Sequence, residues 1–338
     1  MVKKLSILRQ KVDKEASMCY LANMIRQSGI DVPIRLNSRI RKGSLFSLLL
    51  IFGFIFLVLE PAYVKPTGFC GQRLKVFVSI LPQACFVEHI GKDCLDVSVM
   101  VRPGHSPATY EPTPRQMTEL SKARLYFGIG VPFEETWIKR IANANPNMKI
   151  IDTRHGVSLL PMKGHPYHGK KRHYDQTQMD PHVWLSLKAT KIQAQNIHKA
   201  LVAEDPDNRL YYTDNLETFL HNLDRLDTRI SNILKDLKTR KIIVFHPAWG
   251  YFCHDYNLEQ IPIELEGKRP SAKTIAHLVE EAKSEGIKVI FVQQQFTTRS
   301  AQVVANAIGG KVVQLDPLAR DYLKNMKKIA DTLAGAMK

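Results

Sequence analysis

Residues 241–264 read KIIVFHPAWGYFCHDYNLEQIPIE, and this stretch decides the fold because it contains a strand, a helix and a second strand in order. The apolar run 241–245 predicts a buried strand, and the residues near 248–257 have helical spacing. A second short apolar run at 261–264 predicts the next strand. Two strands that are connected by a helix lie parallel to each other in a sheet, and parallel sheets need helices on both faces. The stretch therefore predicts an α/β fold.

The same alternation of strands and helices occurs in two blocks of the chain, and each block contains four predicted strands. The strands of the first block are expected at 74–80, 96–101, 123–129 and 148–152. Those of the second block are expected at 241–245, 261–264, 288–292 and 312–315. We therefore predict two α/β lobes, each with a four-stranded parallel sheet, over 71–206 and 240–338.

A long amphipathic helix is predicted between the two blocks. Apolar residues recur there at alternating steps of four and three: Tyr212, Leu216, Phe219, Leu223, Leu226, Ile230, Ile233 and Leu237. Such steps place every member on one side of a helix. A helix over 207–238 would be about 48 Å long, at 1.5 Å per residue. A coiled-coil seam is the alternative, but the stripe begins and ends between the blocks, which favours a linking helix at 207–239 that packs on both lobes.

The first 70 residues have the pattern of an export leader. A run of 15 apolar residues, Leu45–Leu59, follows a basic segment that contains Arg39, Arg41 and Lys42. Because a membrane-spanning helix needs about 20 apolar residues, this run fits a signal peptide better. We expect cleavage within 60–72, although no clean A-x-A site is present and retention as an anchor is the alternative. Cys70 follows Phe69, which disfavours lipid attachment.

The composition excludes some functions and leaves the cysteines undecided. The chain of 338 residues has a formal net charge of +16, of which residues 1–44 contribute +7 through ten basic and three acidic residues. The remaining basic residues are dispersed and not interleaved with aromatics, so we expect no nucleic-acid binding. The five cysteines form no CxxC pair, which argues against a thiolate zinc site. Cys85 and Cys94 are close enough in sequence to form a disulfide, or else stay as two buried thiols.

Four short proline-containing segments lie far apart in the chain: PGHSP, DPHVWLS, FHPAW and QLDPLA. They contain the candidate metal ligands His105, His182, His246 and Asp316, separated by 77, 64 and 70 residues. Each lies beyond the carboxyl end of a predicted strand, where open α/β sheets bind ligands. Three imidazoles and one carboxylate suit Zn²⁺ or a similar divalent transition ion. We predict a four-ligand site in the cleft between the lobes, with two ligands from each.

Simpler alternatives exist for each of these four residues. A single histidine at a strand end is more often a surface or hydrogen-bonded structural residue, and an aspartate before a proline often forms a turn or caps a helix. The matched positions of all four favour a shared site. We expect surface or packing roles for the histidines on predicted helices and in exposed positions: His89, His198, His221, His254 and His277.

A polar loop at 154–181 contains three more histidines. They are His165, His168 and His173, and they lie among lysine, glycine and aspartate residues without an apolar period. Such a loop supplies donors but no fixed geometry, so we expect at most weak, exchangeable metal binding there.

The segments PGHSPATYEPTPRQM, DPHVWLS, VFHPAWGYF, KVIFVQQQF and VVQLDPLA together resemble, over 74–335, the zinc/manganese group of metal-binding solute-binding proteins of ABC transporters. The resemblance implies two α/β lobes joined by one long helix and a metal ion held by the four residues above. It also implies delivery of the ion to a membrane permease. A histidine at the third ligand position, here His246, implies Zn²⁺, with Mn²⁺ as the lesser candidate.

We therefore predict an extracytoplasmic zinc-binding protein that captures a divalent ion and delivers it to an ABC importer. It is expected to be a monomer in the periplasm or on the outer face of the cytoplasmic membrane, and not an enzyme. A zinc-dependent hydrolase would keep an open coordination position for water, whereas Asp316 would close this shell. A metal-stabilised surface adhesin is the second alternative.

Overall fold

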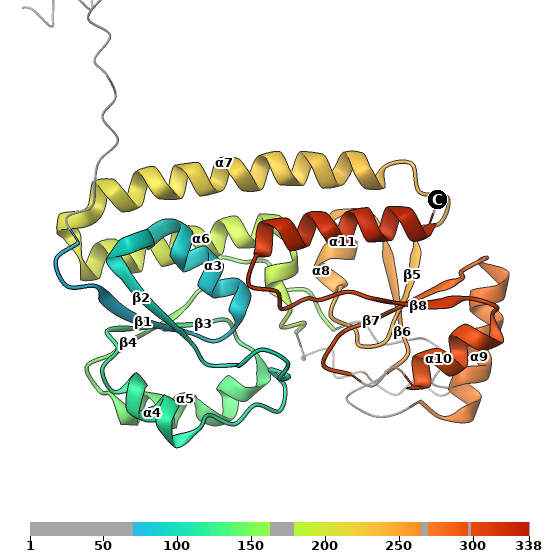
Figure 1. Ribbon diagram of the computed structural model, residues 1–338, viewed down its shortest axis with the longest axis horizontal. Coiled ribbons are helices and arrows are strands. Elements are labelled where there is room, and N and C mark those ends of the chain that lie inside the picture. The colour runs from blue at the N-terminus through green and yellow to red at the C-terminus, as the bar shows by residue number, and fades with distance from the viewer. Residues whose placement is uncertain (1–69, 163–178, 265–269, 297–298, 338) are drawn as a thin grey trace, which may run out of the picture. The chain divides into compact units, whose positions relative to one another are not determined.

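The computed structural model describes residues 70–162, 179–264, 270–296 and 299–337. These residues fall in one compact unit, Lys65–Lys338. The unit contains two four-stranded parallel sheets with helices around them, so the predicted α/β fold with two lobes is confirmed (Figure 1).

The first lobe follows the predicted alternation of strands and helices. Its strands are β1 (Leu74–Val78), β2 (Leu95–Val99), β3 (Leu125–Gly128) and β4 (Lys149–Asp152). Its helices are α3 (Leu81–Gly91), the 3₁₀ turn η1 (Lys92–Cys94), α4 (Pro114–Leu120) and α5 (Pro132–Ala144). Thr113 caps helix α4, because its hydroxyl accepts a hydrogen bond from the Gln116 amide.

The second lobe repeats this pattern. Its strands are β5 (Lys241–Val244), β6 (Glu259–Pro262), β7 (Val289–Val292) and β8 (Lys311–Gln314). Its helices are α8 (Gly250–Asp255), α9 (Ala272–Ser284), α10 (Arg299–Ala307) and α11 (Tyr322–Met337). Ser271 caps α9 by accepting a hydrogen bond from the Thr274 amide at 3.1 Å.

Both sheets have the same strand order, β2-β1-β3-β4 in the first lobe and β6-β5-β7-β8 in the second. In each sheet, the second strand in sequence lies on one side of the first strand, and the third and fourth strands lie on its other side. This creates a switch point between β1 and β3 and another between β5 and β7. Ligands of open α/β sheets bind beyond the carboxyl ends of strands at such points.

Three long helices connect and cover the lobes. They are α6 (Leu187–Glu204), which follows the 3₁₀ turn η2 (Val183–Leu185), then α7 (Arg209–Leu234), which follows η3 (Pro206–Asn208), and α11. Helix α7 packs on α3 and α6, and also on α11 (Figure 1). Because α3 belongs to the first lobe and α11 to the second, the predicted linking helix does pack on both lobes.

The linking helix is shorter than the sequence pattern predicts. It has 26 residues and ends at Leu234, whereas the apolar stripe continued to Leu237. The Arg240 guanidinium donates hydrogen bonds to the carbonyl oxygens of Leu234 and Lys235, at 2.9 and 2.7 Å. These bonds satisfy the carbonyls at the helix end, so the chain turns into β5 while Leu237 stays buried.

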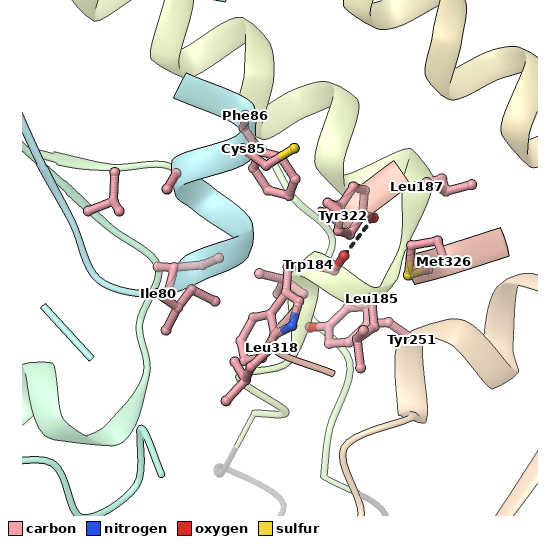
Figure 2. Packing of buried hydrophobic residues seen from close by; sticks show 14 of the residues in the cluster. Ile80, Cys85, Phe86, Trp184, Leu185, Leu187, Tyr251, Leu318, Tyr322 and Met326 are labelled. Atoms are coloured by element: carbon pink, nitrogen blue, oxygen red, sulfur yellow. Dashed lines mark hydrogen bonds between the residues drawn. The ribbon is translucent and has the colours of Figure 1, made fainter. Parts of the chain in front are cut away.

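One continuous hydrophobic core runs through both lobes and beneath α7. At its centre, Trp184 lies near Tyr322 and Leu318 of the second lobe and Ile80 of the first (Figure 2). A second, smaller core lies within the second lobe. The shared core means that the lobes are held together by buried apolar area as well as by the linking helix.

The cysteine pairing differs from the one suggested by sequence spacing. Cys94 forms a disulfide with Cys70, and Cys85 is a free, buried thiol, as is Cys253. Cys85 lies in the middle of α3 with its thiol 3.4 Å from His89 Nδ1, so it faces the helix packing and not Cys94. Because its sulfur is in a disulfide, Cys70 is not a site of lipid attachment in this structure.

Among the residues described by the structure, no helix is both long and apolar enough to cross a membrane. The predicted leader run Leu45–Leu59 lies outside those residues.

We expect Leu223→Ala to lower the free energy of unfolding by about 3 kcal/mol, because Leu223 of α7 is fully buried in the core that runs through both lobes. Leu210→Ala is the matched control on the same helix, since Leu210 is 74% exposed, and it should change the free energy by less than about 0.5 kcal/mol. Urea unfolding measures both values. Equal losses for the two variants would contradict the placement of the buried stripe.

Candidate metal centre

His182 and His246 lie together in the cleft between the two lobes. Their ring centroids are 5.3 Å apart, and both side chains line a cleft of about 440 Å³. His246 follows β5 at the switch point between β5 and β7, and His182 directly precedes η2. Most of the other lining residues are apolar, among them Val131 and Pro132 of the first lobe and Phe296 of the second.

A buried carboxylate orients His182. Asp180 Oδ1 lies 2.7 Å from His182 Nδ1 and also accepts a hydrogen bond from the His182 backbone amide at 2.9 Å. Because an ionised carboxylate only accepts hydrogen bonds, Nδ1 carries the proton in this pair and Nε2 keeps its lone pair. A carboxylate on one ring nitrogen with a free second nitrogen is the usual arrangement of a metal-binding histidine.

His246 is enclosed on several sides. The Phe296 ring stacks on the imidazole, with centroids 5.0 Å apart. The Gln293 side chain accepts from the His246 amide and donates to its carbonyl, at 3.4 and 3.0 Å. The Glu264 carboxylate approaches His246 Nδ1 at 3.4 Å. Burial lowers the pKa of the His246 imidazole, while the nearby Glu264 carboxylate opposes that shift.

The segment that carries His182 is held by the second lobe, although the first lobe precedes it in sequence. The Tyr251 hydroxyl donates to the Asp180 carbonyl at 3.1 Å and accepts from the Leu160 amide at 3.0 Å. Trp184 Nε1 donates to the Pro317 carbonyl at 2.7 Å, and the Tyr322 hydroxyl donates to the Trp184 carbonyl at 2.7 Å (Figure 2). His182 and His246 are therefore attached to the same lobe.

Gly250 leaves the space that Asp180 occupies. A Cβ atom at position 250 would lie 2.4 Å from Asp180 Oδ2, closer than real carbon–oxygen contacts. The glycine at the first position of α8 thus permits the close approach of the carboxylate that orients His182. Asp180 and Gly250 were not singled out from the sequence, although the DPH spacing was the signal for Asp180.

The other two predicted ligands lie outside the cleft. His105 is exposed on the loop after β2, where its ring packs edge-on against Tyr110 at 5.6 Å. The same loop instead directs Ser106, Pro107 and Ala108 into the cleft.

Asp316 follows β8, and its Oδ1 accepts a hydrogen bond from the Leu318 amide at 2.8 Å. The next two residues, Pro317 and Leu318, line the cleft. Over the described ranges, no three or more His, Cys, Asp or Glu side chains are grouped as a metal shell. The structure therefore brings together two of the four predicted ligands, His182 and His246.

The remaining histidines have the places expected of them where they are described. His89, His198, His221 and His277 lie on helices, and the His254 side chain is 66% exposed. The loop histidines His165, His168 and His173 lie outside the described residues.

Comparison with known proteins identifies the family of this architecture. Residues 76–336 match the family model described as zinc-uptake complex component A, periplasmic. The chain is 30% identical over 254 residues to the high-affinity zinc uptake system protein ZnuA of Bacillus subtilis, covering 73% of this chain and 79% of that protein. It is 28% identical to the manganese ABC transporter substrate-binding lipoprotein PsaA of Streptococcus anginosus, over 77% of this chain and 84% of that protein.

Solved structures agree with the fold. A crystal structure of ZnuA superposes with a TM-score of 0.74 and 43% identity, covering 79% of this chain and all of that chain. The laminin-binding protein Lmb of Streptococcus agalactiae, described as a bifunctional adhesin and metal transporter, gives a TM-score of 0.70 at 21% identity over 79% of this chain and all of that chain. At that identity the likeness shows the fold alone.

We expect Gly250→Ala to weaken divalent-ion binding roughly tenfold, because the new methyl group would displace Asp180 and free the His182 ring. Gly335→Ala is the matched control: this glycine is helical, with no atom within 4 Å of an added Cβ. Calorimetric titration with Zn²⁺ would compare the two variants with the unchanged protein. Unaltered affinity in Gly250→Ala would show that Asp180 does not orient the ligand.

Proposed function

We propose that this chain, which belongs to the zinc-uptake complex component A periplasmic family, captures Zn²⁺ outside the cytoplasm. It then delivers the ion to the membrane permease of an ABC importer. The family consists of solute-binding transport proteins, so the chain is not an enzyme. The observation that supports the proposal best is the facing pair His182 and His246, each with a buried carboxylate near its Nδ1.

The electrostatics of the cleft fit a divalent cation. Two neutral imidazoles would contribute no charge, while Asp180 and Glu264 would contribute one negative charge each from positions behind the rings. These negative charges favour a divalent cation in surroundings that are mainly apolar, where Glu135 and Arg154, which also line the cleft, carry opposite charges. Imidazole nitrogen favours Zn²⁺ over Mn²⁺, which prefers oxygen ligands. We therefore propose Zn²⁺ as the cargo and Mn²⁺ as a weaker competitor.

We propose that His105 and Asp316 complete the shell when their loops move toward the cleft. The support is their position: each is within three residues of side chains that already line the cleft, Ala108 and Pro317 respectively. His165, His168 and His173 would form a secondary, exchangeable capture loop. In this proposal the His182 and His246 pair is preformed and the other two ligands close on it.

The export pattern and the disulfide support an extracytoplasmic location, in the periplasm or on the outer face of the cytoplasmic membrane. We propose that the protein acts there as a monomer. The hydrolase alternative is set aside with the family assignment. For the adhesin alternative, the likeness to Lmb extends to the fold, and nothing in the described residues favours adhesion over transport.

Competition titration should show a single tight site for Zn²⁺ that binds Mn²⁺ more weakly. We expect His182→Ala and His246→Ala each to lower the affinity at least about 100-fold, since each removes a ligand and leaves its carboxylate unpaired. His221→Ala, on the exposed face of α7, is the control and should leave the affinity unchanged.

The variants His105→Ala and Asp316→Ala test the other two ligands in the same titration. Each should weaken binding, and Asp316→Ala should leave a weaker site with water in the vacated position. Full affinity in either variant would remove that residue from the proposed shell without affecting the assignment of His182 and His246.

The affinity should depend on pH in a direction set by His246. Zn²⁺ needs the neutral imidazole, and burial lowers the pKa of His246, so this ligand stays neutral where an exposed histidine is already protonated. Protonation of His246 should therefore lower the affinity only below about pH 6.5, the ordinary pKa of a histidine. Titrations between pH 5 and 8 measure the curve. A fall that is complete above pH 7 would contradict the buried, neutral ligand.

A further inference from the structure

Glu264 is a buried carboxylate beside the candidate metal centre, and one of its two oxygens has no hydrogen-bond partner among the described residues. Its side chain is 6% exposed, and neither its Oε2 nor His246 Nδ1 has a hydrogen-bond partner among the described residues. The two atoms face each other at 3.4 Å, without the alignment of a hydrogen bond. A buried carboxylate oxygen without a hydrogen bond is unfavourable, so its retention calls for a role outside the packing of the lobe.

The strand register fixes Glu264 in this position. Strands β5 and β6 pair in parallel with Val244 opposite Pro262, and the Glu264 amide donates to the Phe245 carbonyl at 2.8 Å. Carried two residues beyond the strands, the same register places Glu264 beside His246. The backbone of Glu264 is therefore held beside His246 by the sheet.

The two histidines of the cleft differ in how firmly they are held. Asp180 lies 2.7 Å from His182 Nδ1, which is the distance of a charge-assisted hydrogen bond. The corresponding distance from Glu264 to His246 is longer by 0.7 Å. The His182 ring is thus already oriented by a hydrogen bond. The His246 ring has one face stacked on Phe296, and its Nδ1 is free to approach Glu264.

We propose that Glu264 is a positioning residue for metal binding. It accepts a hydrogen bond from the Nδ1–H of His246 when a divalent ion binds at Nε2, and its negative charge helps to compensate the charge of that ion. The inference rests on the proposed function, because it assigns a role within the same site. Asp180 has the corresponding role behind His182.

Two properties of a Glu264→Gln variant should move in opposite directions. Its affinity for Zn²⁺ should fall 10- to 100-fold, because the amide keeps the size of the side chain but loses its charge. Its melting temperature without added metal should be equal to or higher than that of the unchanged protein, because the variant no longer buries an unpaired charge. A residue needed only for packing would lower the melting temperature instead.

The variant Glu264→Asp separates charge from size. It keeps the carboxylate but shortens the side chain, so it should bind Zn²⁺ more tightly than Glu264→Gln does. If Glu264 acted by filling space, glutamine would be the better replacement and the order would be reversed.

Glu204→Gln is the matched control. The Glu204 side chain is 4% exposed at the far end of the first lobe, where it pairs with Arg124 and with Lys149, the latter at 2.9 Å. This variant should lower the melting temperature and leave the affinity for Zn²⁺ unchanged.

Zinc competition titration and thermal unfolding of the four proteins decide the inference. It is overturned if Glu264→Gln binds Zn²⁺ as tightly as the unchanged protein does, if glutamine outperforms aspartate, or if Glu264→Gln alone lowers the melting temperature as Glu204→Gln does. Failure of the unchanged protein to bind Zn²⁺ would instead overturn the proposed function, so the two failures are distinguishable.

Discussion

Tyr251 and Trp184 hold the segment that carries His182 against the second lobe, and the geometry of the cleft depends on these hydrogen bonds. Without them His182 would follow the first lobe, to which it is joined through the chain. With them, the segment that carries His182 is bonded to the lobe that carries His246. The loop with Ser106 and Ala108 faces the pair from the other lobe.

The two carboxylates that accompany the histidines lie on one side of the cleft, and Glu135 lines it from the first lobe. Asp180 and Glu264 both lie behind the histidine pair, within structure that belongs mechanically to the second lobe. The first lobe presents mainly small or apolar groups to the cleft, such as Ala108 and Val131. Capture of an ion would then begin on a preformed half-site and end with movement of the opposite loop. The continuous core beneath α7 limits the extent of that movement.

Much of the fold could be predicted from the sequence, because parallel sheets reveal themselves as short apolar runs between amphipathic helices. The strand expected at 241–245, for example, is β5. The end of α7 could not be predicted, because the apolar stripe continues to Leu237. The helix ends where Arg240 donates to its last carbonyls, and Arg240 is not part of the stripe.

The candidate site was harder to predict, since ligand residues are set by loop geometry. His246 lies two residues beyond β5, so its position was implied by the sheet. His105 lies six residues beyond β2, in a loop where Gly104 has a φ of +81° and the His105 amide donates to the Arg102 carbonyl. This turn directs the ring outward, and no residue pattern encodes that direction. Glu264 was missed because its proximity to His246 requires the β5–β6 register, which a single sequence does not supply.

The disulfide between Cys70 and Cys94 also has a consequence for how the protein matures. It joins the start of the described chain to the segment just before β2, across a sequence separation of 24 residues. Closing a loop of that size stabilises a folded domain by about 3 kcal/mol in the chain-entropy model, and thiols stay reduced in the bacterial cytoplasm. Newly made chains therefore lack this stabilisation until they are oxidised. The disulfide would thus add its stabilisation to the folded chain only in an oxidising compartment.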